Sequence, residues 1–167
     1  MEPSSFRFQP RPTVCHFRTN PSETSGSLVA RRYILANVTA TDTNLKNITL
    51  RLYNSTRALI NSSNSTTSPL YTNFSVSADG IYFFNATAYD KSGNRNNTET
   101  RNVTVDTINP AINFTSPTEN SGVTLFTRNN IVVNVTATDT NLKNITIQLY
   151  NSTQEERMST VVNSCHV

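Results

Sequence analysis

Apolar and polar residues alternate along five stretches of the chain, which is the pattern of β-strands with one buried face. In residues 34–41 every second position is apolar, and residues 45–53 place Ile48, Leu50 and Leu52 on one face. The same alternation predicts strands at 70–76, 81–89 and 98–105, separated by polar turns. No stretch has the apolar period of an amphipathic helix, so the pattern predicts an all-β fold.

The alternation also predicts which side chains form the core. On the 81–89 strand, Phe84 should point inward and Phe83 outward, because neighbouring residues of a strand face opposite sides. Tyr82 follows the turn at 78–80 and can donate a hydrogen bond back to it, as in the tyrosine corner of immunoglobulin sandwiches. An ordinary buried tyrosine is the alternative. The predicted core includes Ala36, Val38, Leu50, Tyr82, Phe84 and Val103.

A long internal repeat sets the domain organisation. Residues 37–49 return letter for letter as 134–146, an offset of 97, and only two positions differ between 37–56 and 134–153. A period this long indicates tandem domains, because each unit can enclose its own core. Short strands with frequent turns in a unit of this size are typical of an antiparallel sandwich of about seven strands.

Four segments resemble bacterial-type immunoglobulin-like repeats of bacterial and archaeal surface proteins, and the resemblance covers roughly residues 13–153. They are 40–42, 79–82, 86–94 and 105–110. The resemblance implies an extracellular spacer or adhesive stalk with neighbouring immunoglobulin-like repeats or other surface proteins as partners. It departs at both ends, since 1–12 match nothing and 154–167 abandon the pattern of the first repeat. Such repeats share a scaffold rather than a chemistry.

We therefore expect an all-β, antiparallel immunoglobulin-like β-sandwich, with one complete repeat followed by a truncated one. Residues 1–12 form a disordered N-terminal segment, 13–109 form repeat 1, and 110–167 hold only the early strands of repeat 2. A fragment of a larger surface protein with no independent function is one alternative reading.

The composition is unlike that of an ordinary cytosolic enzyme. Asn, Thr and Ser make up 67 of the 167 residues, while only 15% are charged. No apolar run approaches the length of a membrane span, and the first residues lack the basic start and apolar stretch of a signal peptide. The basic residues are scattered, so we expect no nucleic-acid partner.

Thirteen Asn-x-Ser/Thr sequons make the chain a possible glycoprotein. A strand with an Asn/Thr face and an apolar face also produces this motif automatically, so the sequons could simply keep the outer faces polar. The candidate asparagines are Asn37, Asn47, Asn54, Asn61, Asn64, Asn73, Asn85, Asn96, Asn102, Asn113, Asn134, Asn144 and Asn151.

Oxygen-rich loops are weak candidates for calcium, although we expect no cofactor. Asp42 and Asp90 should meet at one end of the sandwich, and Asp106 should approach Asp139 at the joint between repeats. Turn-forming carboxylates are the competing interpretation. Two Cys-His pairs, at 15–16 and 165–166, lack the spacing of a zinc motif and are expected to be unpaired thiols rather than a disulfide.

Enzymatic interpretations find no support in the motifs, so we expect no catalytic residues. The chain has two histidines, four glycines and neither a nucleophile elbow nor a phosphate loop. Tyr53, Phe83 and Tyr89 should point outward on neighbouring strands. This face suggests the alternative of a carbohydrate- or protein-binding module, although the absence of Trp weakens a sugar site.

We predict that residues 110–167 in isolation are disordered or self-associate. Their strands at 131–135 and 145–149 carry an apolar face whose covering strands, by the offset, have no counterpart in this segment. A few strands with an open face are marginal in water and their edges template association. Hydrogen exchange measures this: protection in a demonstrated monomer comparable with that of repeat 1 would contradict it. The full chain should also be less soluble than residues 1–109.

Overall fold

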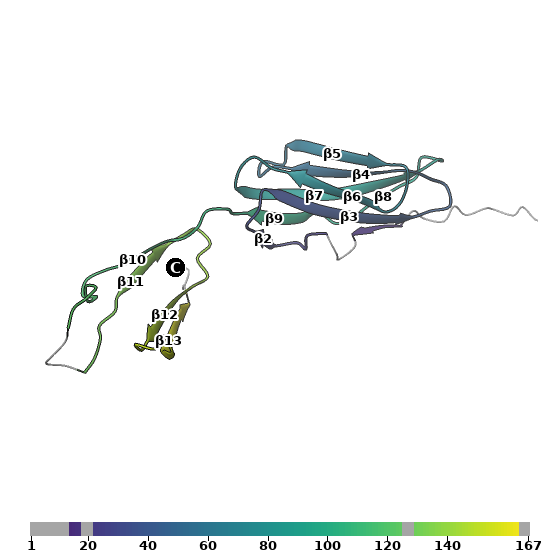
Figure 1. Cartoon of the computed structure of the whole chain (residues 1–167). Coiled ribbons are helices and arrows are strands. Elements are labelled where there is room, and N and C mark those ends of the chain that lie inside the picture. The colour runs from purple at the N-terminus through teal and green to yellow at the C-terminus, as the bar shows by residue number, and fades with distance from the viewer. Residues whose placement is uncertain (1–13, 18–21, 125–128, 164–167) are drawn as a thin grey trace, which may run out of the picture. The chain divides into compact units, whose positions relative to one another are not determined.

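The computed structural model describes residues 14–17, 22–124 and 129–163, and the chain divides into two units, 1–107 and 108–167 (Figure 1). We call these unit 1 and unit 2 and describe each by itself. The segment 1–12, expected to be disordered, lies outside the described residues. All the described regular structure is β-strand.

Two sheets form unit 1. The smaller sheet has the order β1-β3-β6, and the larger has the order β2-β9-β7-β4-β5, with β8 paired to β7. All pairs are antiparallel except β2 and β9, which run parallel. The strands are β1 (Val14–Phe17), β2 (Ser27–Val29), β3 (Tyr33–Thr41), β4 (Leu45–Tyr53), β5 (Leu59–Ser65), β6 (Leu70–Ser75), β7 (Gly80–Asp90), β8 (Arg95–Asn97) and β9 (Arg101–Val105).

One apolar core lies between these sheets, and it contains all six residues predicted from the alternation. Phe84 and Phe74 are the largest fully buried side chains. The Tyr82 hydroxyl donates a 2.8 Å hydrogen bond to the Ala78 carbonyl, which confirms the tyrosine corner. Unit 1 is an immunoglobulin-like β-sandwich.

The alternation missed four short or edge strands, namely β1, β2, β5 and β8. In β5 every residue is at least partly exposed, so the strand has no apolar face to produce the alternation. The predicted strand 98–105 is correct for Arg101–Val105 but begins too early, because the chain leaves the sheet at 98–100. There the Thr98 hydroxyl accepts a hydrogen bond from the Ala86 amide (2.9 Å), in the place of a backbone carbonyl.

The four described strands of unit 2 correspond to β1, β3, β4 and β5 of unit 1. Its strands are β10 (Ala111–Phe114), β11 (Val135–Thr138), β12 (Asn144–Tyr150) and β13 (Glu156–Asn163). The pairs β10–β11 and β12–β13 keep the registers of β1–β3 and β4–β5 after the shift of 97, including the irregularity at the end of β4. Strand β13 follows the register of β5 although the sequence of this segment departs from the first repeat.

The turn that leads into β13 explains this agreement. In both units an asparagine side chain holds the turn: Asn54 Oδ1 accepts hydrogen bonds from Thr56 and Ala58, and Asn151 Oδ1 accepts them from Thr153 and Glu155. The Asn-Ser-Thr sequence is common to both turns, so the same local contacts direct two different strand sequences into one register.

Replacing Phe84 by Ala should lower the free energy of unfolding by about 3–5 kcal/mol, because Phe84 is fully buried and its loss leaves a cavity. Phe83→Ala is the matched control and should cost about 1 kcal/mol, since Phe83 is half-buried and stacks only under the Arg57 guanidinium. Urea unfolding of both variants measures the difference. Equal losses would contradict the inward assignment of Phe84.

Candidate functional site

The edge of the larger sheet in unit 1 carries the contacts that tie the start of the domain to its end. Strand β2 pairs in parallel with β9 over three residues, from Ser27 opposite Val103 to Val29 opposite Val105. Backbone hydrogen bonds bracket this pair, from the Gly26 amide to the Asn102 carbonyl (2.8 Å) and from the Asp106 amide to the Val29 carbonyl (3.0 Å).

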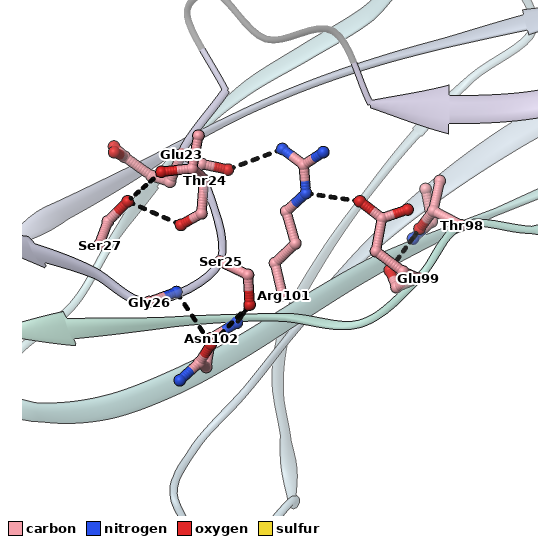
Figure 2. Close-up of polar contacts among 10 residues, drawn as sticks. Glu23, Thr24, Ser25, Gly26, Ser27, Thr98, Glu99, Arg101 and Asn102 are labelled. Atoms are coloured by element: carbon pink, nitrogen blue, oxygen red, sulfur yellow. Dashed lines mark hydrogen bonds and ion pairs between the residues drawn. The ribbon is translucent and has the colours of Figure 1, made fainter.

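Polar side chains reinforce the beginning of the pair, as Figure 2 shows. Asn102 Oδ1 accepts hydrogen bonds from the Ser25 hydroxyl (2.6 Å) and the Gly26 amide (3.0 Å). Arg101 donates to the Glu23 carbonyl (2.9 Å) and forms an ion pair with Glu99 (2.7 Å). Gly26 has φ +84, a left-handed conformation that suits glycine at this turn. We call Glu23, Ser25, Gly26, Arg101 and Asn102 the edge clamp.

A second cluster lies just after β9, where the chain leaves unit 1. Asp79 accepts hydrogen bonds from the Thr107 amide (2.9 Å) and the Thr107 hydroxyl (3.0 Å), and it lies 3.4 Å from Arg32. The amide of Thr107 lowers the pKa of the Asp79 carboxyl, burial opposes this, and the Thr107 hydroxyl and Arg32 add to the lowering. These contacts attach the last residue of unit 1 to the turn that precedes β7.

The first two calcium candidates belong to neighbouring turns. Leu45 pairs with Asp90, and the Lys91 amide donates to the Asn44 carbonyl, so the turns meet as expected. Asp90 is buried, and its two oxygens accept hydrogen bonds from the Ser92 amide and from the Asn94 amide and side chain (2.7–2.8 Å). The Asn94 side chain is the main cause of the lowered pKa of Asp90. The contacts favour turn formation as the role of this carboxylate.

Calcium binding at Asp42, Asp106 and Asp139 stays a prediction. Asp42 and Asp139 each accept a hydrogen bond from the amide two residues on, which is the same turn in the two units. Asp106 belongs to unit 1 and Asp139 to unit 2. Among the residues that the structure describes, no group of three His, Cys, Asp or Glu residues could hold a metal ion.

The sequon asparagines differ in exposure. Asn37 is buried, with its Oδ1 lacking a hydrogen-bond partner, and the Oδ1 of half-buried Asn47 is in the same state. Asn54 and Asn151 hold turns, and Asn102 belongs to the edge clamp. The others are half-buried or exposed: Asn61, Asn64, Asn73, Asn85, Asn96, Asn113, Asn134 and Asn144. Their glycosylation stays a prediction.

The three residues of the predicted aromatic face, Tyr53, Phe83 and Tyr89, lie in two separate places. Tyr53 and Phe83 are direct partners on β4 and β7, and the Arg57 guanidinium lies 3.4 Å from the centre of the Phe83 ring. Tyr89 lies six residues beyond Phe83 on β7 and pairs with Asn47, which separates it from this pair by about 20 Å. Exposed apolar side chains flank the pair instead: Leu28, Leu59 and Ile81.

The Cys-His pairs fall at the edge of the described part. Cys15 and His16 lie in β1, whose backbone alone is described, and Cys165 and His166 lie outside the described residues. Within the described residues, no helix is long and apolar enough to cross a membrane.

Comparison with known proteins gives likenesses of fold. No protein-family model and no curated protein matches the chain. Fibronectin(III)-like modules of CbhA from Clostridium thermocellum align over 91% of this chain and 80% of that chain, with 20% identity and a TM-score of 0.48. An engineered protein aligns over 59% of this chain and 21% of that chain, with 18% identity and a TM-score of 0.44. Likenesses at this level concern the course of the chain, not its chemistry.

Sequence reasoning missed the edge clamp and the Asp79 cluster. Asn102 and Ser25 are 77 positions apart, and Asp79 and Thr107 are 28 apart, so no local pattern connects them. The Asp79-Gly-Ile-Tyr82 sequence drew attention only to Tyr82. The one signal in the sequence was that Asp79 lies in the turn just before Tyr82.

Asp79→Asn should lower the melting temperature of unit 1 near neutral pH. The folded pKa of Asp79 is lowered, so its stabilising effect is present above the unfolded value of about 4 and is lost as the pH falls through the folded pKa. The free energy of unfolding of the wild type should therefore fall more steeply than that of the variant as the pH is lowered below about 4. Thermal unfolding followed against pH measures this, with Glu155→Gln in unit 2 as the control. If the melting temperatures of the wild type and of Asp79→Asn changed in parallel with pH, that result would contradict the stabilising role of the Asp79 carboxylate.

Proposed function

We propose that this chain is a non-catalytic spacer module of an extracellular cell-surface protein, a stalk that holds other parts of that protein at a distance. The observation that carries the proposal is the direction of the strands at the two ends of unit 1. Strand β1 begins opposite Thr41, whereas β9 ends opposite Gly80, so the chain enters and leaves at opposite ends of the sandwich. Nine residues of β3 separate these ends by about 30 Å.

This arrangement suits a module under tension. A pull on the two ends draws β1 against antiparallel β3 and draws β2 against parallel β9, in each case along the strand axis. The hydrogen bonds of a pair loaded in this way stretch together rather than one after another. The edge clamp adds side-chain hydrogen bonds at the beginning of the β2–β9 pair, so it adds resistance where a pull loads this pair.

The surface of unit 1 supports a spacer as well. On the outer face of the larger sheet, Thr49 donates to Asn64 (2.6 Å), Arg51 to Thr87 (2.9 Å) and Thr87 to Asn97 (2.8 Å). In each pair, a donor and an acceptor on neighbouring strands satisfy each other's hydrogen-bonding capacity. Few charged groups therefore remain to attract partners. A face whose polar side chains are largely bonded to one another is suited to a module that separates other domains.

Force spectroscopy on the full chain between two reference domains tests the proposal. Unit 1 should unfold in one event that releases the 79 residues from Ser27 to Val105, which corresponds to roughly 26 nm of extended chain. Asn102→Ala removes the acceptor of two hydrogen bonds and should lower the unfolding force and cost about 1–2 kcal/mol of stability.

Asn73→Ala is the matched control, because Asn73 is exposed on β6, away from the β2–β9 pair. It should leave the unfolding force unchanged. Gradual extension without a discrete event, or equal effects of the two variants, would remove the mechanical role.

Protein binding through the outer face is a second candidate function. Tyr53 and Phe83 lie side by side there, and Leu28, Leu59 and Ile81 add exposed apolar area next to them. Aromatic and apolar side chains gathered beside an arginine are typical of protein interfaces. Carbohydrate binding at this face is the weaker alternative, since Tyr89 does not extend the aromatic pair.

A further inference from the structure

The sequons of unit 1 differ in the residue that stands between the asparagine and the serine or threonine. In one group this middle residue belongs to the buried core of the sandwich. These sequons follow from the alternation itself, because a strand with an Asn/Thr face and an apolar face produces the motif, and no sugar is needed to explain them. Their asparagines are Asn37, Asn47, Asn73, Asn85 and Asn102.

Two adjacent sequons on β5 have another origin. Residues 61–63 read Asn-Ser-Ser and residues 64–66 read Asn-Ser-Thr, so neither contains the apolar residue that the alternation of a half-buried strand supplies. After the shift of 97, the two asparagines correspond to Met158 and Val161. The β5 sequons are therefore explained neither by the strand pattern nor by the repeat.

Both β5 sequons are accessible over their whole length. Asn61 and Asn64 are exposed, and the two residues after each of them are exposed or half-buried. Asn54 and Asn96 also precede polar residues, but both are half-buried, and Asn54 holds the turn before β5. Within the described part of unit 1, only the β5 sequons combine an exposed asparagine with residues that all lie outside the core.

The side chains of the two asparagines leave the atom that accepts a sugar available. Asn64 Oδ1 accepts a hydrogen bond from the Thr49 hydroxyl (2.6 Å), and Asn61 Oδ1 accepts one from the Ser62 amide (2.8 Å). Neither Nδ2 atom donates a hydrogen bond to any of the residues that the structure describes. A sugar replaces one of the two hydrogens on Nδ2 and leaves Oδ1 as an acceptor, so both hydrogen bonds can persist after modification.

Strand β5 is the last strand of the larger sheet and has an open edge. Within the described residues it pairs only with β4. Open edges template association with other chains, and proteins commonly protect them with charged residues, proline or bulges. No charged residue lies between Arg57 and Asp79, β5 contains no proline, and the irregularity in its pairing affects only its beginning near Leu59. None of these devices protects the rest of the strand.

We propose that Asn61 and Asn64 are N-glycosylation sites and that their glycans shield the open edge of β5. Asn61 pairs with Leu52 and Asn64 with Thr49, which lie on opposite faces of β4, so the two sugars leave the strand on opposite sides. A bulky, solvated group on each side excludes a further strand from this edge. The proposal rests on the extracellular location that we propose above.

The modification is the transfer of a glycosyl group from an activated donor, a lipid-linked oligosaccharide diphosphate. The asparagine Nδ2 atom forms a bond to the anomeric carbon of the first sugar, and the bond from that carbon to the diphosphate breaks. The lipid diphosphate leaves with the electron pair of that bond, and Nδ2 gives up one proton. Ser63 and Thr66 supply the hydroxyl that the motif requires.

Transfer to the folded full chain tests the two sites. The chain is incubated with a lipid-linked oligosaccharide and an oligosaccharyltransferase that accepts folded proteins, and mass spectrometry of its peptides gives the rate at each asparagine. Asn61 and Asn64 should be modified at least about tenfold faster than Asn73, whose sequon becomes accessible only when its strand opens.

Asn73 is the matched control, because it is exposed like Asn61 and its sequon also ends in serine, but the middle residue is the buried Phe74. Free peptides of residues 57–67 and 70–78 should be modified at similar rates, since neither is folded. Transfer to neither β5 site, or equal rates at Asn61 and Asn73 in the folded chain, would overturn the assignment of the sites.

Amide exchange tests the shielding. In the sugar-free full chain, exchange in β5 should slow as the protein concentration rises, because open edges of different molecules pair; in the modified chain it should not depend on concentration. The double variant Asn61→Gln, Asn64→Gln, taken through the same transfer reaction, should behave like the sugar-free chain. Exchange in β5 that is independent of concentration without sugar would overturn the shielding. The unfolding force of unit 1 tests the spacer role separately and does not depend on these outcomes.

Discussion

The apolar layer between the two sheets of unit 1 is the interaction on which the rest of the molecule depends. It joins strands from the first half of the domain, such as β3 and β4, to strands from the second half, such as β6 and β7. Neither half can bury its apolar face alone. Unit 2 illustrates this directly, because nearly the same sequence as the first half of unit 1 keeps its registers but leaves its apolar face exposed.

The polar faces of the strands follow from the same constraint. A strand in a two-layer sandwich needs one apolar side and one side compatible with water, and this chain uses Asn and Thr for the second side rather than charges. Hydrogen bonds such as Thr49 to Asn64 run across neighbouring strands. Most of the sequons follow from the placement of Asn and Thr at every second position of these strands. In the turns, Asn54 and Asn151 use the same side-chain chemistry to set the direction of the next strand.

Polar contacts add to the core at the boundaries of unit 1. The edge clamp attaches the 23–27 turn to β9, and Asp79 attaches Thr107 to the turn before β7. Each cluster acts where the chain enters or leaves the final sheet pairing, so tension along the chain would reach these residues early. The mechanical role that we propose for the module rests on the local chemistry of these few serine, asparagine and aspartate residues.

The sequence by itself determined the faces of the long strands, the core around Phe84, the tyrosine corner and the repeat, because each of these follows from local alternation or from direct identity. The tertiary structure alone decided the edge strands β2, β5 and β8, whose short or two-sided polar sequences become strands only by pairing with neighbours. It also separated Tyr89 from Tyr53 and Phe83, since outward direction does not determine distance along a strand. The clamp between Ser25 and Asn102 depends on a contact between residues that are 77 positions apart, which no local pattern encodes.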